Sequence, residues 1–334
     1  MAMKFVLALA FIFTLYSCGS SDSDARKSDR KILQAEPLKG LTDSINRFPD
    51  DPELRIRRAL ALSQMNEHRQ AGADYQKAWE LTGDGEVLLS YASNALLSQD
   101  LPKAISLLEE GVKKFPDNTE FSRRLAEINL QKGNPKEALV QFDNMIKTDP
   151  TDFEAWYEKG ALLARMKDTA GAIKALEKSF ELVPINYSGM ALAGIYAARK
   201  NPRTLEICNI LIARDSTQAQ TEPVYMKGVY YADTKQYDNA MKAFDECIRR
   251  DWKMTDAYIE KGIILFERKQ YQEALKLFNM TTTVSNTDPD AYYWLGRCYE
   301  ATGKTEDAIT NYERALSLDN TFSEARTALR RLSS

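Results

Sequence analysis

The chain has 334 residues, of which 44% are hydrophobic and 28% charged, so it can build a large core and is not expected to be disordered throughout. Its 45 basic and 48 acidic residues give a net charge of -3. That balance lacks the dense positive field that binding to phosphate backbones requires, and we expect no nucleic-acid partner. The single histidine, His68, leaves little scope for histidine-based metal sites or catalytic triads, and we place it at the surface near a helix end.

Residues 1–17 have the pattern of a secretory leader. Lys4 precedes an apolar run from Phe5 to Tyr16, which is too short to span ~30 Å of hydrocarbon as a helix. Residues 15–18, Leu-Tyr-Ser-Cys, resemble the lipobox of bacterial lipoproteins. That resemblance implies cleavage before Cys18 and attachment of lipid to this cysteine. The alternative is a plain secretory leader that contains a cysteine.

Residues 18–35 are polar and show no apolar periodicity, which predicts a flexible tether between the lipid and the folded part. Gly19, and no aspartate, follows the cysteine; by resemblance to enterobacterial sorting rules this favours the outer membrane over the inner one. The Ser/Asp-rich start is also similar to the surface-export tethers of Bacteroidetes lipoproteins. We therefore expect a lipid-anchored protein of the cell envelope, on the periplasmic face of the outer membrane or on the cell surface.

The rest of the chain has a period of 34 residues. Glycine recurs at this interval at positions 160, 194, 228, 262 and 296, and alanines at 126 and 92 extend the series backwards. A second small-residue series follows twelve residues later, at Ala104, Ala138, Ala172, Ala240, Ala274 and Ala308. Large apolar residues stand four places further on, at Leu108, Phe142, Leu176, Ile210, Phe244, Phe278 and Tyr312. Such a fixed period indicates a repeat architecture.

Each 34-residue unit predicts two short amphipathic helices, because its large residues recur every four places along one helical face. We expect the small residues of the first two series to face each other where the helices cross, and the large residue of the third series to fill the adjacent groove. Enlarging Gly262 or Ala274 is then expected to overpack the crossing at a cost of ~1–3 kcal/mol.

The pattern resembles the tetratricopeptide repeat (TPR) family, whose usual positions are matched by Trp156/Gly160, Leu295/Gly296/Tyr299, Tyr237/Ala240/Phe244, Tyr271/Ala274/Phe278 and Gly303/Ala308/Tyr312/Ala315. The resemblance implies an all-α, right-handed superhelical solenoid of about eight helix-turn-helix repeats within residues 36–334. The repeats are expected to begin near residues 52, 85, 119, 153, 187, 221, 255 and 289. A partial unit precedes them, and a capping helix at 322–334 follows.

The fifth repeat departs from this pattern. Glu206 stands where the other repeats have a small alanine, Gln218 stands where several have a proline, and residues 216–221 form a polar connection. In a stack held together by nearest-neighbour interfaces, such a unit is expected to be a weak joint with faster amide exchange over residues 200–222. The alternative is a degenerate but well-packed repeat.

In the TPR family the first helices line the concave side, so the fifth and ninth places of each repeat predict the lining of a groove. From the fourth repeat on these places are mostly apolar or aromatic, which suits contact with a protein or peptide. The partner-binding candidates, including the adjacent Phe266, are Tyr157, Ile195, Tyr225, Val229, Ile259, Ile263, Phe266 and Tyr293. The alternative is that these residues pack between neighbouring first helices.

Acidic residues occupy the second place of most repeats, where helix N-termini favour negative charge. They also argue against the carboxylate-clamp subclass of the family, in which cationic residues hold a partner's terminal carboxylate. Cys208, Cys247 and Cys298 show no metal-binding or redox spacing and are expected to be buried free thiols, with one disulfide as the alternative.

These features predict a membrane-anchored protein-interaction scaffold of the bacterial cell envelope, with no catalytic residues, metal or cofactor. We expect a monomer, because the polar end helix with Glu324, Arg326, Arg330 and Arg331 opposes end-to-end stacking. One alternative is an accessory, ligand-binding component of an envelope secretion, assembly or nutrient-uptake complex. An enzyme is a further alternative, which the absence of a phosphate loop or nucleophile elbow disfavours.

Overall fold

The structure is a computed structural model that describes residues 31–332, so the predicted leader, Cys18 and most of the predicted tether lie outside the described residues. Within residues 31–332 the regular structure is entirely helical, which confirms the predicted all-α fold class. The chain divides into two compact units at Asn144/Met145, inside α8. We describe each unit by itself, and the handedness of the predicted superhelix stays a prediction.

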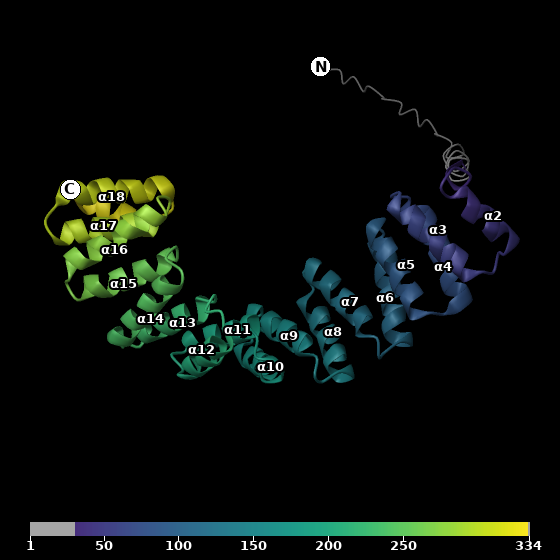
Figure 1. The fold of residues 1–334 in the computed structure, drawn as a ribbon, viewed down its shortest axis with the longest axis horizontal. Coiled ribbons are helices and arrows are strands. Elements are labelled where there is room, and N and C mark those ends of the chain that lie inside the picture. The colour runs from purple at the N-terminus through teal and green to yellow at the C-terminus, as the bar shows by residue number, and fades with distance from the viewer. Residues whose placement is uncertain (1–30, 333–334) are drawn as a thin grey trace, which may run out of the picture. The chain divides into compact units, whose positions relative to one another are not determined.

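The first unit contains helix hairpins joined in chain order. α3 packs against α4 and α5 against α6, while α4 contacts α5 and α6 contacts α7, so each hairpin rests on the next (Figure 1). The helices of this unit, with the one that crosses its boundary, are α2 (Lys39–Arg47), α3 (Pro52–Gln64), α4 (His68–Thr82), α5 (Gly85–Leu97), α6 (Leu101–Lys114), α7 (Thr119–Gln131) and α8 (Pro135–Thr148).

The second unit continues the arrangement with α9 against α10, α11 against α12, α13 against α14, α15 against α16 and α17 against α18, and α19 covers the last hairpin. Its helices are α9 (Phe153–Arg165), α10 (Thr169–Leu182), α11 (Asn186–Ala197), α12 (Arg203–Arg214), α13 (Glu222–Asp233), α14 (Tyr237–Arg250), α15 (Thr255–Glu267), α16 (Tyr271–Val284), α17 (Pro289–Ala301), α18 (Thr305–Leu318) and α19 (Ser323–Leu332).

A buried polar chain fastens the N-terminal end of the first unit. The Arg58 guanidinium of α3 donates to both carboxylate oxygens of Asp74 in α4, at 2.6 and 2.8 Å, and to the Thr42 hydroxyl of α2 at 3.2 Å. The same hydroxyl donates to the Leu33 carbonyl at 2.7 Å. Ile32 and Leu33 also pack on the core of this unit. The residues directly before α2 are therefore held against the first hairpin.

In the regular repeats the in-register glycine lies against the large residue of the second helix. A Cβ added at Gly228 or Gly262 would stand 2.5 Å from the ring of Phe244 or Phe278, and one at Gly296 would stand 2.6 Å from the ring of Tyr312. At Gly160 the nearest atom is Leu176 Cγ at 2.7 Å. We expected the glycine to face the alanine of the second series, but the large residue comes closest, because its side chain spans the crossing.

The fifth repeat breaks the 34-residue register. The buried residues of α12 are Thr204, Ile207, Cys208 and Leu211, and they correspond in spacing to Ala172, Ala175, Leu176 and Ser179 of α10 and to Ala240, Ala243, Phe244 and Cys247 of α14. The step from α10 to α12 is thus 32 residues, and the step from α12 to α14 is 36. The second helix of this repeat starts two residues early, and the connection before α13 restores the register.

The turns inside the hairpins show the same displacement independently. In the second unit they contain a residue with positive φ at Lys167, Lys200, Lys235, Lys269 and Gly303. The first two intervals are 33 and 35 residues, whereas the next two are 34. The early start of α12 therefore begins at the turn after α11.

This displacement corrects three sequence predictions. Gly194 has no atom within 4 Å of the place where a Cβ would stand, so it is not at the helix crossing in spite of its position in the series. The crossing is made by Ala193 and Thr204, both fully buried, and the Thr204 hydroxyl donates to the Ala193 carbonyl at 3.4 Å. Glu206 is exposed and does not replace the small residue, while Ile210 is 44% exposed and does not fill the groove.

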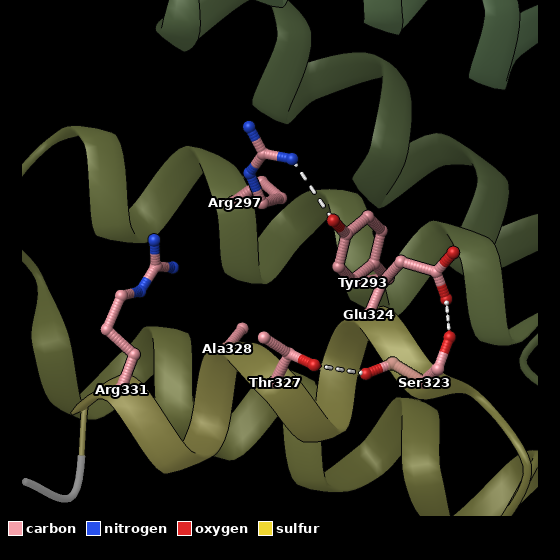
Figure 2. A pocket seen from close by; sticks show the side chains of 7 residues that line it. All are labelled: Tyr293, Arg297, Ser323, Glu324, Thr327, Ala328 and Arg331. Atoms are coloured by element: carbon pink, nitrogen blue, oxygen red, sulfur yellow. Dashed lines mark hydrogen bonds between the residues drawn. The ribbon is translucent and has the colours of Figure 1, made fainter.

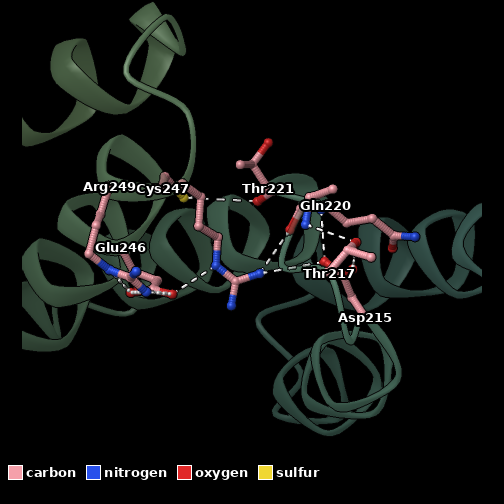
Figure 3. Close-up of polar contacts among 9 residues, drawn as sticks. Asp215, Thr217, Gln220, Thr221, Glu246, Cys247 and Arg249 are labelled. Carbon is pink, nitrogen blue, oxygen red and sulfur yellow. Dashed lines mark hydrogen bonds and ion pairs between the residues drawn. The ribbon is translucent and has the colours of Figure 1, made fainter.

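A buried arginine of the next repeat anchors the polar connection after α12 (Figure 3). Arg250 Nη1 donates to the Gln220 carbonyl at 3.1 Å and lies 3.7 Å from Asp215 Oδ2, and the Arg250 and Asp215 side chains are only 7% and 4% exposed. The Gln220 N–H donates to the same carboxylate at 2.8 Å, which lowers the pKa of Asp215 together with the Thr217 hydroxyl. These contacts favour the well-packed alternative over a weak joint.

Candidate partner-binding surface

The first helices of neighbouring repeats approach one another in the second unit. α11 contacts α13, α13 contacts α15, and α15 contacts α17. In a stack of hairpins, the side on which successive helices lie closest is the inner side, and solenoid proteins use such surfaces for binding. We call the surface formed by α9, α11, α13, α15 and α17 the inner face.

Seven of the eight predicted residues are half-buried on the inner face, and Ile259 is in the core at 8% exposed. Tyr157 and Ile195 pack on the core between α10 and α12, and Tyr225 and Val229 on the core that contains Phe244. The others rest on the last two cores of the unit, as Ile263, Phe266 and Tyr293 do. Packing between helices therefore accounts for Ile259. The seven others pack with part of their surface and leave part accessible, and their role in binding stays a prediction.

Aromatic side chains and one arginine gather where the inner face ends. The Arg297 guanidinium stands 5.0 Å from the ring centre of Phe266, 5.3 Å from that of Trp294 and 5.8 Å from that of Tyr293. Arg297 Nη1 also donates to the Tyr293 hydroxyl at 3.1 Å. Within residues 31–332, Arg297 makes no ion pair. Rings on several sides hold the guanidinium plane while leaving most of its N–H groups without a protein acceptor.

A pocket of about 370 Å³ adjoins this cluster between α17 and α19 (Figure 2). Tyr293 and Arg297 form one wall, and the cap helix supplies the other with Ser323, Glu324, Thr327, Ala328 and Arg331. Arg331 is held by Glu300 at 2.7 Å. The pocket thus mixes both signs of charge with hydroxyl groups, and the cap helix takes part in the surface as well as covering the last hairpin.

Carboxylates surround the central part of the inner face. Burial raises the pKa of Glu260 on α15, and the nearby charges of Asp233 and Asp256 raise it further. Burial likewise raises the pKa of Tyr225, with contributions from Glu260 and Asp256. Because like charges shift these groups together, the surface from α13 to α15 carries a negative potential among its apolar side chains. Glu260 was not predicted, since its place in the repeat was not among those assigned to the lining.

The cysteines are buried and unpaired in the structure, as predicted, so the disulfide alternative is wrong. Burial raises the pKa of Cys208, Cys247 and Cys298 to about 12 in each case, which makes them poor nucleophiles. His68 begins α4 but is half-buried, and its Nδ1 has no partner, so its placement at the surface was wrong. Across residues 31–332, no group of three His, Cys, Asp or Glu side chains is arranged to hold a metal ion.

Comparison with known families settles the repeat type. A tetratricopeptide repeat model matches residues 95–166, and a second one matches residues 153–186. The chain contains tetratricopeptide repeats. Residues 233–315 match a further model, described as subunit 3 of the anaphase-promoting complex, or cyclosome. In the part of the chain that the structure covers, no helix combines the length and the hydropathy needed to cross a membrane.

Similar solved structures share the fold at low sequence identity. The C-terminal part of a TPR protein from Cytophaga hutchinsonii is 14% identical, covers 72% of this TPR chain and 99% of its own, and has a TM-score of 0.56. PilW, a type IV pilus biogenesis factor, is also 14% identical, covers 63% and 98%, and has a TM-score of 0.53. The human general transcription factor 3C polypeptide 3 is 24% identical over 150 residues, which are 43% of this chain and 17% of the human protein.

Proposed function

We propose that this TPR protein is a lipid-anchored scaffold of a bacterial cell envelope that captures a segment of a protein partner on its inner face. The observation that carries the proposal is the series of half-buried aromatic and aliphatic side chains along α9 to α17, which pack on the core and keep accessible surface. Large side chains of this kind provide binding area at low entropic cost, because the core already holds them in place.

The charges on the inner face define the chemistry of the partner. Glu260, Asp233 and Asp256 favour a cation between α13 and α15, whereas the aromatic-bound Arg297 at the far end favours a carboxylate. A partner segment that carries apolar side chains, a lysine or arginine in its middle and an acidic group at one end would match this order. Complementary charge of this kind selects the partner and its direction more than it adds affinity.

The leader supports the membrane part of the proposal. The lipobox-like residues before Cys18 imply an acylated cysteine, and more than one acyl chain gives stable anchoring. Anchoring raises the concentration of the scaffold next to membrane-bound clients. Envelope assembly machinery is one class of client, and PilW is described as a pilus biogenesis factor. We place the protein at the outer membrane, on its periplasmic face or on the cell surface.

Crosslinking of the full-length protein in its native cells, followed by identification of the captured partner, tests the proposal. Ile263→Glu and Tyr225→Ser are expected to abolish capture while the helical content stays unchanged. Met280→Glu is the matched control, because Met280 is 49% exposed on α16, away from the inner face, and capture should persist. Undiminished capture by a folded Ile263→Glu variant would refute binding on the inner face.

The lipid anchor is tested separately with Cys18→Ala. This variant is expected to lose labelling by an alkyne-tagged fatty acid and to leave the membrane fraction. Membrane association that survives the substitution would show that the lipid on Cys18 is not the anchor, without affecting the conclusion about the inner face.

A further inference from the structure

A pocket opens between α10 and α12, on the side of the second helices and away from the inner face. Its volume is about 410 Å³, within the range of ligand-binding clefts. We call it the outer pocket, and it is lined by Glu177, Phe180, Glu181, Pro184, Leu192, Arg203, Glu206, Ile207 and Ile210. Leu192 and Ile207 are buried, at 1% and 3% exposed, and Ile210 is 44% exposed.

The early start of α12 explains the outward position of Ile210. Six residues after the first buried residue of the second helix, other repeats have Lys77, Glu110, Lys178, Glu246 and Arg314. A charged residue is therefore sufficient at this place, and packing does not require an isoleucine there. An isoleucine in the open, beside a cavity with apolar buried walls, is the kind of surface that marks an interaction site.

The rim of the outer pocket carries uncompensated negative charge. The Arg203 guanidinium is already engaged, since it pairs with Glu177 at 2.8 Å and lies 5.5 Å from the ring centre of Tyr196. Glu206 makes no ion pair or hydrogen bond within the described residues. Glu181 pairs only with Lys178, at 3.1 Å, and that pair is largely exposed to solvent, so another cation can replace the lysine at little cost.

We propose that the outer pocket is a second docking site, which binds a helical segment of a partner protein that places one large apolar side chain beside a lysine or arginine. The apolar side chain enters against Leu192, Ile207 and Ile210. The neighbouring cation is held by Glu206 and Glu181. The site lies on other helix faces than the inner face, so one scaffold can hold two partners, and the proposal is independent of binding on the inner face.

A defined peptide tests this proposal on the whole chain from residue 19 onward. The probe is an alanine-rich helical peptide of about 18 residues with one central leucine and a lysine four places to each side. Two reference peptides replace the lysines by glutamate or the leucine by alanine. The readout is the shift of the methyl NMR signals of Ile210, Ile207 and Leu192 during titration.

The lysine–leucine peptide is expected to shift these three signals saturably, and both reference peptides are expected to bind at least about tenfold more weakly, because each lacks one of the two contacts. Ile210→Lys should weaken binding by a similar factor. Met280→Lys is the matched control: Met280 occupies the same place in α16 and is 49% exposed, and this variant should bind as the wild type does. Ile263→Glu on the inner face should also leave binding unchanged.

Three results would overturn the proposal. The first is equal binding of the lysine and glutamate peptides, and the second is wild-type affinity in Ile210→Lys. The third is a shift of the Ile210 signal with protein concentration alone, together with a dimer in light scattering, which would show that a second copy of the chain occupies the pocket.

Discussion

Gly194 and Gly262 occupy the same place in the sequence period, yet the structure predicts that alanine has opposite effects at the two positions. A Cβ at Gly262 would lie 2.5 Å from Phe278 Cε1 and 2.6 Å from Cζ. Phe278 is fully buried and stacks on Trp294 with ring centres 6.0 Å apart, so it cannot yield freely. At Gly194 the same atom meets nothing within 4 Å.

The expected magnitudes follow from two competing effects. Replacing glycine by alanine inside a helix stabilises it by ~1 kcal/mol, because alanine loses less backbone entropy on folding. Overpacking a core costs ~1–3 kcal/mol. Gly194→Ala is therefore expected to raise the free energy of unfolding by ~0.5–1 kcal/mol, and Gly262→Ala to lower it by about 1 kcal/mol once the helix gain has been subtracted.

Urea unfolding followed by circular dichroism measures both changes. Since repeats can unfold separately, amide exchange in α11–α12 and in α15–α16 should locate each effect. Gly296→Ala, whose Cβ would lie 2.6 Å from Tyr312 Cε1, is expected to behave like Gly262→Ala. If Gly194→Ala and Gly262→Ala shift the unfolding midpoint in the same direction, the assignment of helix crossings in the fifth repeat is wrong.

Three further predictions concern charges and thiols. Arg250→Ala should speed amide exchange at residues 218–221 by roughly tenfold, because the Gln220 carbonyl loses its buried donor; Arg249→Ala, which removes an exposed guanidinium of the same helix, should not, and equal effects would contradict the anchoring role of Arg250. Burial raises the pKa of Glu260, so the folded state holds that proton more tightly than the unfolded state, and stability falls as pH rises from the ordinary glutamate value of about 4.3 through the raised one. Glu260→Gln should therefore raise the urea midpoint at pH 7 and leave it unchanged at pH 3; an unchanged midpoint at pH 7 would count against the shift. Finally, with the pKa of each buried thiol at about 12, the folded Cys18→Ser protein should not react with Ellman's reagent at pH 8, and Cys208, Cys247 and Cys298 should all react after unfolding, whereas rapid reaction of the folded protein would show that a thiol is accessible.

The regular repeats could be predicted closely from the sequence, because one residue type at one interval has the same cause each time. Gly228, Gly262 and Gly296 each lie against the aromatic residue sixteen places later, so the period reports a real contact. In the fifth repeat, glycine at 194 continues the series by coincidence, while Ala193 and Thr204 make the contact. No residue in a single sequence distinguishes a glycine that packs from one that only stands in register.

The candidate surface was harder to predict than the fold. Ile259 and Ile263 are one helical turn apart on α15, and both suit a groove, but Ile259 is in the core while Ile263 is half-buried. The difference depends on how the neighbouring repeats cover each position, which the residue types do not contain. The role of Trp294 beside Arg297 was missed for the same reason, since it requires the ring of Phe266 from the preceding repeat.

The paired steps of 32 and 36 residues also bear on the design of consensus proteins from this chain. Averaging its units at a constant interval would enter Glu206 and Ile210 into columns that are buried elsewhere, and would leave Thr204 and Cys208 out of them. A template built that way would inherit a carboxylate at a helix contact. Inserting a two-residue gap before α12 and closing it before α13 keeps every column physically equivalent.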